Sequence, residues 1–249
     1  MHEIRQEKMN SFIQEQEVAS IKQLQALFPE ISLMTIHRDL DVLAQAGFIT
    51  KVRGGARSVQ HTRDLAFGVR AKENLTGKAQ VAEKAAKLVG EASCIFLDSG
   101  TTCLALAYLL PDAPINVITT GPNIATALAH VAGPAVTMCP GHLNKENLTV
   151  SGHSTLHFLE TLNIDLAFIG VSGYGKDEGF TCGKENEMVV KRQIIKQARK
   201  IVVLCDQTKF HRRMPFTFAK LEDIDVVVSD TILPEDFLQM AQAAGTVVL

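Results

Sequence analysis

Two loops in the C-terminal part of the chain carry the residue types of an anion-binding site. The segments FLDSGTT, residues 96–102, and TTGPN, residues 119–123, each stand where an apolar strand should end and a helix begin. Small residues at such a turn expose main-chain N–H groups, and the helix dipole favours negative charge there. The hydroxyls of Ser99, Thr101 and Thr102 add further donors. Two such loops side by side would suit one phosphate and the hydroxyls of a small sugar, although each alone is also typical of an ordinary turn.

Other side chains of this part could complete or change such a site. Lys209 stands in CDQTKF directly after another expected strand, so its ammonium group is a candidate partner for a phosphate. An exposed turn lysine is the alternative. His142, His153 and His157 lie close together in sequence, but no established metal spacing links them to Cys or Asp. We therefore expect neither a metal nor another cofactor.

A second group of candidate residues lies near the N-terminus, in TIHRDLDVLAQAGFITKVRGGA, residues 35–56. Ile36, Leu40 and Leu43 recur at helical spacing and predict a helix that is capped by Ser32 and has one apolar side. With the short helix expected before it, this is a helix-turn-helix, whose second helix enters the major groove with its N-terminus first. The residues then placed for DNA are Ser32, Met34, Thr35, His37 and Arg38.

The residues after this helix predict a short strand, a tight turn and a return strand, which together form a wing. Arg53, Gly54 and Gly55 make the turn, and Lys51 stands just before it. Cations on a wing bind phosphates or enter the minor groove. Glycines there let the main chain approach DNA closely.

Acidic residues and a structural alternative weigh against DNA binding. Asp39 and Asp41 would repel phosphate unless they are turned away, and a small helical docking domain with solvated charges would have the same spacing. The net charge of −2 argues against binding of nucleic acid by the whole surface. It leaves room for a local basic patch.

Alternating strands and helices must position the C-terminal loops. Short, almost wholly apolar strands separated by helices predict a mainly parallel sheet that is covered on both faces. The expected strands are residues 93–98, 115–120, 135–139, 165–170, 200–206, 225–230 and 246–249. The expected helices between and before them are 78–89, 101–110, 122–131, 152–162, 184–199 and 234–244. The fold class is therefore α/β, preceded by N-terminal helices at 1–16, 21–28 and from Ser32.

The bulk properties indicate a cytoplasmic protein. The N-terminus MHEIRQEKMN is charged and lacks the apolar region of a signal peptide. No apolar run reaches the ~20 residues that span a bilayer. The 5 cysteines are odd in number and widely spaced, which favours buried, reduced thiols.

The segment SIKQLQALFPEISLMTIHRDLDVLAQAGFITKVRGGA resembles the N-terminal DNA-binding signature of the DeoR family of bacterial transcriptional regulators. That signature has a Ser-x-x-Thr-Ile-Arg-Arg-Asp-Leu core and ends near His-Gly-Gly-Ala. The residues that fit are Ser32, Thr35, Ile36, Arg38, Asp39, Leu40, Gly47, Gly54, Gly55 and Ala56. His37 and Arg53 replace the usual Arg and His, and these departures bear on the operator sequence.

The resemblance extends over nearly the whole chain and implies an effector domain similar to ribose-5-phosphate isomerase that binds phosphorylated sugars. It assigns these residues to the pocket or its surroundings: Asp98, Ser99, Gly100, Thr101, Thr102, Thr120, Asn123, Gly170, Lys191 and Lys209. The family often has Gly-Gly where this chain has Pro140-Gly141, which bears on the choice of ligand.

The chain departs from the related isomerases where they need a base. Aldose–ketose isomerisation requires a carboxylate beside the sugar carbons. Those enzymes carry an Asp-Gly-Ala-Asp-Glu run after the strand that matches DLAFIG, where this chain reads Gly-Val-Ser-Gly-Tyr, and a later glutamate falls near Lys191. We expect no enzyme. Asp177, Glu178 and Glu187 keep an isomerase as the alternative.

We therefore expect a winged helix-turn-helix domain at 1–57, a basic linker at 58–74 and an α/β effector domain at 75–249. One winged domain makes few base contacts, so a homodimer or homotetramer on paired half-sites of double-stranded operator DNA is expected. The resemblance implies repression of a sugar-catabolic operon that a phosphorylated sugar relieves. An activator and a corepressor-dependent regulator are the alternatives.

Overall fold

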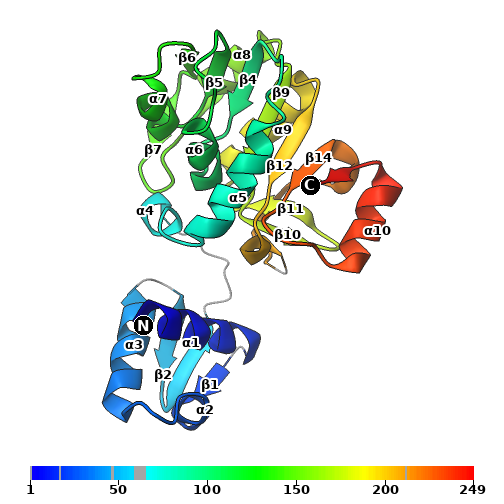
Figure 1. Ribbon diagram of the computed structural model, residues 1–249. Coiled ribbons are helices and arrows are strands. Elements are labelled where there is room, and N and C mark those ends of the chain that lie inside the picture. The colour runs from blue at the N-terminus through cyan, green and yellow to red at the C-terminus, as the bar shows by residue number, and fades with distance from the viewer. Residues whose placement is uncertain (1, 17, 46–47, 59–65, 211) are drawn as a thin grey trace. The chain divides into compact units, whose positions relative to one another are not determined.

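The computed structural model describes residues 2–16, 18–45, 48–58, 66–210 and 212–249 (Figure 1). The chain divides into two compact units, Met1–Arg63 and Asp64–Leu249. Residues 59–65 of the expected linker lie outside the described residues, as does Gly47, the expected end of the third helix. The later part of that expected linker contains a short helix, α4 (Phe67–Arg70).

Helices and a small antiparallel sheet form the first unit. Its elements are α1 (His2–Gln16), β1 (Val18–Ser20), α2 (Ile21–Leu27), α3 (Leu33–Gln45), β2 (Ile49–Val52) and β3 (Gly55–Ser58), with the strand order β1-β3-β2. Met9 and Ile13 of α1 share one core with Leu24, Ile36 and Leu40. The helices and the hairpin that the sequence predicts here are confirmed.

Serine side chains begin both helices of the helix-turn-helix. Ser20 Oγ accepts from the main-chain N–H of Gln23 at 3.2 Å, and Gln23 Oε1 accepts from the N–H of Ser20 at 2.9 Å. These two reciprocal bonds form a capping box. Ser32 Oγ accepts from the N–H of Thr35 at 3.2 Å. Both caps satisfy N–H groups that a helix N-terminus leaves without a partner.

Strand β1 was not expected from the sequence, and it explains one glycine of the wing. β1 pairs with β3, and Ala19 lies opposite Ala56. A Cβ atom on Gly55 would lie 2.1 Å from the carbonyl oxygen of Ala19, a separation that no real Cβ tolerates. Gly55 is therefore required by the sheet, whereas Gly54, with φ of 82° and open space around it, is required by the turn.

A parallel sheet forms the centre of the second unit. Its 7 strands run in the order β15-β14-β12-β9-β4-β5-β6. They are β4 (Cys94–Leu97), β5 (Asn116–Thr119), β6 (Ala135–Met138), β9 (Leu166–Gly170), β12 (Ile201–Leu204), β14 (Val226–Val228) and β15 (Val247–Val248). All the strands that the sequence predicts for residues 75–249 belong to this sheet.

Helices cover the sheet on both faces (Figure 1). One core contains residues of α5 (Leu75–Ala86), α6 (Thr101–Ala107) and α7 (Pro122–Leu128), and the other contains residues of α8 (His153–Glu160), α9 (Glu185–Gln197) and α10 (Glu235–Ala244). Successive residues of a strand point to opposite faces, so Ile95 and Leu97 join the first core and Phe96 joins the second.

Short strands outside the main sheet were not expected from the sequence. β7 (His142–Asn144) and β8 (Thr149–Ser151) form a hairpin, and β10 (Gly173–Gly175), β11 (Gly179–Cys182) and β13 (Phe216–Ala219) form a second small sheet. Elements of three or four residues are too short to show a period, so only their long-range partners define them. Within the described ranges, no helix combines the length and the hydropathy that crossing a bilayer would require.

Candidate functional site

The outer face of α3 carries the residues expected to read DNA. Ile36 and Leu40 are fully buried on the inner side. Ser32, His37 and Arg38 are exposed, Met34 is 81% exposed and Thr35 is half-buried. This helix therefore exposes its N-terminal turn and a side that carries polar residues and Met34, which is the arrangement of a recognition helix.

Asp39 is turned away from this face. Its side chain is 1% exposed, Oδ2 lies 2.6 Å from Arg5 Nε, and Oδ1 accepts from Gln6 Nε2 at 2.9 Å. The hydrogen bond with Asp39 raises the pKa of Arg5 above its usual value. The carboxylate thus ties α3 to α1 and adds no repulsion at the outer face, so its expected conflict with phosphate does not arise.

This buried pair predicts a stability effect. Asp39→Asn keeps the shape of the side chain but removes its charge, so the free energy of unfolding of the first unit should fall by ~1–3 kcal/mol. Chemical denaturation of the full chain, with a probe in residues 1–58, would measure it. Asp41→Asn is the matched control, because Asp41 sits on the same helix in an exposed pair worth ~0–1 kcal/mol. Equal losses in the two variants would contradict the assignment.

The wing carries the exposed cations that the sequence predicts. Lys51 and Arg53 are both exposed, and Lys51 Nζ lies 2.6 Å from Asp41 Oδ1 on α3. Gly54 is exposed at the tip, whereas Gly55 is buried against β1. On binding DNA, Lys51 would exchange an exposed carboxylate for a phosphate, a small cost because exposed pairs are weak.

A hollow opens in the second unit at the carboxyl ends of its central strands. Small-molecule sites in α/β proteins usually lie at this edge of a parallel sheet. The hollow is lined by Arg70, Asp98, Ser99, Gly100, Thr101, Thr102, Gly170, Val171, Ser172, Glu187, Lys191, Lys209 and Arg212. Most of the expected effector residues are therefore brought together.

Lys191 lines this hollow with its charge already compensated. It is 6% exposed, and its ammonium group donates to Asp98 Oδ2 and, at 2.8 Å, to the carbonyl oxygen of Gly170. Asp98 Oδ2 also accepts from the N–H of Gly170 at 3.1 Å. Burial lowers the pKa of Lys191, but the charge and hydrogen bond of Asp98, together with the charges of Cys182 and Glu187, outweigh burial and the pKa is raised. The ion pair of Asp98 and Lys191 links the ends of β4 and β9. Its two opposite charges largely cancel, so it adds little net charge to the hollow.

Arg70, Lys209 and Arg212 are the other cations that line the hollow. Lys209 is 7% exposed, and its Nζ lies 4.0 Å from Asp206 Oδ2. From the sequence, Arg70 is expected only as part of a basic linker, and Arg212 is not expected in the pocket. No local pattern distinguishes these two arginines from surface charges, because the fold alone brings their segments to the strand ends.

Thr120 and Asn123 do not line the hollow, although their loop lies beside it. A Cβ on Gly121 would lie 2.9 Å from Ser99 Cα and 2.9 Å from Asn123 Oδ1, so the two predicted loops are neighbours. Within the described part of the chain, Thr120 Oγ1 and both polar atoms of the Asn123 side chain are buried without a hydrogen-bond partner. Such groups are rare in folded proteins and indicate a place for a water or a ligand hydroxyl.

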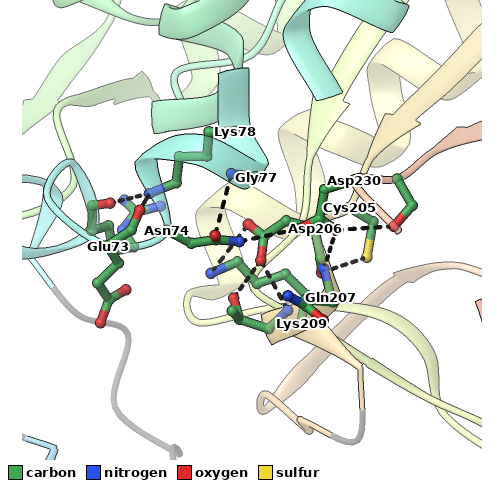
Figure 2. A network of polar contacts seen from close by, with 12 residues as sticks. Glu73, Asn74, Gly77, Lys78, Cys205, Asp206, Gln207, Lys209 and Asp230 are labelled. Carbon is green, nitrogen blue, oxygen red and sulfur yellow. Dashed lines mark hydrogen bonds and ion pairs between the residues drawn. The ribbon is translucent and has the colours of Figure 1, made fainter. Parts of the chain in front are cut away.

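A network of hydrogen bonds fixes the loop that carries Lys209 (Figure 2). Asp230, which follows β14, accepts from the main-chain N–H of Gln207 at 2.8 Å and from Asn74 Nδ2 at 3.3 Å. Asn74 caps α5 through its Oδ1, which accepts from the N–H of Gly77 at 3.3 Å. The network therefore fixes the loop that carries Lys209 to the start of α5.

An exposed recognition helix with a basic wing, and a separate α/β unit with a cationic hollow, define a winged helix-turn-helix regulator with a ligand-binding unit. Residues 5–62 match the DeoR-like helix-turn-helix domain, and residues 73–231 match the DeoR C terminal sensor domain. The chain belongs to the DeoR family of transcriptional regulators.

Curated relatives agree with this over most of their length. The transcriptional regulator GlpR of Haloferax volcanii is 32% identical over 220 residues, which are 88% of this chain and 86% of the relative. The transcriptional repressor GlcR of Bacillus subtilis is 29% identical, over 88% and 85% of the two chains. The L-fucose operon activator of Haemophilus influenzae is 30% identical, over 93% of each. Among solved structures, ribose 5-phosphate isomerase A of Methanocaldococcus jannaschii matches 55% of this chain and 54% of its own with a TM-score of 0.40 and 19% identity.

Proposed function

We propose that this protein is a cytoplasmic repressor of a sugar-catabolic operon, and that a phosphorylated sugar or a derivative lowers its affinity for DNA. The observation that carries the proposal is the hollow at the strand ends, which Arg70, Lys209 and Arg212 line together with the hydroxyls of the loop after β4. Several cations at one hollow suit an anionic ligand. Hydroxyl and carboxylate groups beside them suit a sugar.

In this proposal, the two loops at the strand ends contact different parts of the ligand. The cations hold the phosphate, and Ser99, Thr101 and Thr102 donate to it or to the adjoining hydroxyls. Thr120 and Asn123 gain partners when the ligand reaches the neighbouring loop. The ion pair of Asp98 and Lys191 holds the strand ends that line the hollow in fixed positions.

Repression requires that the ligand bind the low-affinity arrangement of the protein better than the DNA-bound one. A coupling of ~1–3 kcal/mol is usual between two such sites and changes DNA affinity ~5–150-fold. A homodimer or homotetramer on paired half-sites completes the proposal, because one recognition helix makes few base contacts.

The main alternative is an activator or a corepressor-dependent repressor with the same two units, since one relative is named an activator and another a repressor. Titration of the ligand against operator affinity separates inducer from corepressor. A reporter driven by the operator separates repression from activation.

We propose that the protein is not an enzyme. Asp98 is paired with Lys191 and so is a poor base, while Glu178 lies 3.1 Å from Arg213. Glu187 is, beside Asp98, the other carboxylate among the described residues that line the hollow, and it is the candidate base of an isomerase. An assay on pentose and hexose phosphates decides this, and turnover that Glu187→Gln abolishes would establish the isomerase.

A thermal-shift screen tests the ligand class. Sugar phosphates should stabilise the second unit, by ~2.7 kcal/mol at a ligand concentration 100 times Kd, and the free sugars should not. Lys209→Gln should abolish the shift, because it removes one of the cations. Arg192→Gln is the control, since Arg192 is an exposed side chain that bonds the carbonyl oxygen of Thr217 at 2.8 Å. Equal shifts with free and phosphorylated sugars would rule out the anion site.

A further inference from the structure

Lys78 is a buried lysine near the cations of the hollow that the proposed function does not use. It lies in α5 and is 4% exposed. Its ammonium group donates to the main-chain carbonyl oxygens of Arg70 and Glu73. Figure 2 shows it in the same polar neighbourhood as Asn74, Asp206 and Lys209. Burying an ammonium group is costly, so its fixed place on two carbonyls needs an explanation.

The two carbonyls belong to residues 66–73, the first described segment of the second unit. α4 lies in this segment, and the N–H of Phe67 donates to the carbonyl oxygen of Glu146 at 2.7 Å. Arg70 extends from the same segment to line the hollow. Lys78 therefore holds the main chain that presents Arg70. In the sequence, this segment comes shortly after the boundary between the two units at Arg63.

The charge of Lys78 responds to the charges of the hollow. Burial, and next the charge of Lys209, lower the pKa of Lys78 to about 8, and Arg70 acts in the same direction. Asp206 and Glu73 act against them. An anion held by Arg70 and Lys209 would attract the ammonium group as well and would raise this pKa. Occupation of the hollow and protonation of Lys78 therefore favour each other.

We infer that Lys78 is a positioning residue that couples an anion in the hollow to the order of residues 66–73, the segment that leads to the DNA-binding unit. The inference rests on the proposed function, since it requires an anionic effector in that hollow. Anion binding strengthens the hold of Lys78 on the two carbonyls. Residues 66–73 are then more firmly ordered in the liganded protein than in the free protein.

Hydrogen exchange of the full chain tests the coupling. The probe is sulfate, a dianion that does not titrate at neutral or alkaline pH. The variant is Lys78→Met, and the control is Lys84→Met, because Lys84 lies on the same helix and also donates to a main-chain carbonyl, that of Ser229, at 2.8 Å. The quantities are the affinity for sulfate and the exchange rates of amides 66–73 with and without it.

In the wild type and in Lys84→Met, sulfate should slow exchange in this segment at least about threefold. In Lys78→Met, sulfate should still bind, within about threefold of the wild-type affinity, but the slowing should be lost. Slowing that persists in Lys78→Met overturns the inference.

Proton uptake supplies a readout that a merely structural lysine would not change. At pH 8, sulfate binding to the wild type should take up ~0.4 proton if the pKa of Lys78 rises by about one unit, measured by calorimetry in buffers of different ionisation enthalpy. Lys78→Arg stays charged with or without sulfate, so it should lose the uptake, and its residues 66–73 should exchange slowly in both states. Uptake that persists in Lys78→Arg overturns the inference even where Lys78→Met does not fold.

The failure of the inference and the failure of the proposed function can be told apart. If sulfate does not bind the wild type, or binds Lys209→Gln equally well, the anion site fails and the inference falls with it. If sulfate binding depends on Lys209 while Lys78→Met behaves as the wild type, only the inference fails.

Discussion

Replacing Arg38 with alanine is expected to remove operator recognition while the first unit stays folded. Arg38 is exposed on the outer face of α3, so the free energy of unfolding should change by no more than ~0.5 kcal/mol. A bidentate arginine–guanine contact discriminates by ~1–3 kcal/mol, which is about 5- to 150-fold in affinity at each half-site. On paired half-sites the two losses multiply.

The measurement begins with the selection of binding sites from a randomised pool of DNA duplexes. Fluorescence anisotropy then compares the selected operator with a scrambled duplex at fixed salt, because affinity for DNA depends steeply on salt. Arg38→Ala should approach the affinity of the wild type for the scrambled duplex. If Arg38→Ala bound the operator as tightly as the wild type, α3 would not be the recognition helix.

A variant of the wing gives the contrast to this result. Arg53→Ala should weaken binding to both duplexes alike and reduce the salt dependence by about one counterion, because phosphate contacts carry affinity without sequence. If Arg53→Ala no longer distinguished the operator from the scrambled duplex while Arg38→Ala still did, sequence recognition would belong to the wing and not to α3.

Replacing Lys191 with methionine is expected to destabilise the second unit by ~3–5 kcal/mol at neutral pH. The substitution leaves the carboxylate of Asp98 buried without its cation, and an uncompensated buried charge is strongly destabilising. Urea denaturation, followed by a probe in residues 75–249, would measure the loss. The volume change is small, so lost packing explains little of it.

The double variant Asp98→Asn with Lys191→Met is the control. It removes both charges, and the amide of the new asparagine can still accept from the N–H of Gly170. Most of the lost stability should return, because a buried pair that is replaced as a whole often costs little. A double variant as unstable as the sum of the two single variants would show that the residues act independently.

The raised pKa of Lys191 sets the pH dependence of this contribution. Its folded-state pKa lies above the unfolded value of about 10.4, so the stabilisation is fully present below that pH. It is lost as the pH rises through the folded-state pKa. The difference in unfolding free energy between the wild type and the double variant should therefore stay constant from pH 7 to about 9 and change only at strongly alkaline pH.

The sequence by itself determined the main helices, the wing hairpin and the strands of the parallel sheet, but not the short strands β1, β7, β8, β10, β11 and β13. Apolar runs of strand length and helical repeats are local patterns, and both cores follow from them. Ser20 and Ser32 fixed two helix starts in the same way, because a cap bonds groups only a few residues away. Ile36, Leu40 and Leu43 fixed the inner side of α3 and, by exclusion, the outer face with Arg38.

The tertiary structure alone decided which charges meet. The sequence could not show that Asp39 turns inward to Arg5, that Asp98 compensates Lys191, or that Gly55 faces the carbonyl of Ala19. Nor could it bring Arg70 and Arg212 to one hollow. Charged residues follow no period, and their partners lie dozens of residues away, so the order of strands in the sheet and the packing of the helices decide what each side chain contacts.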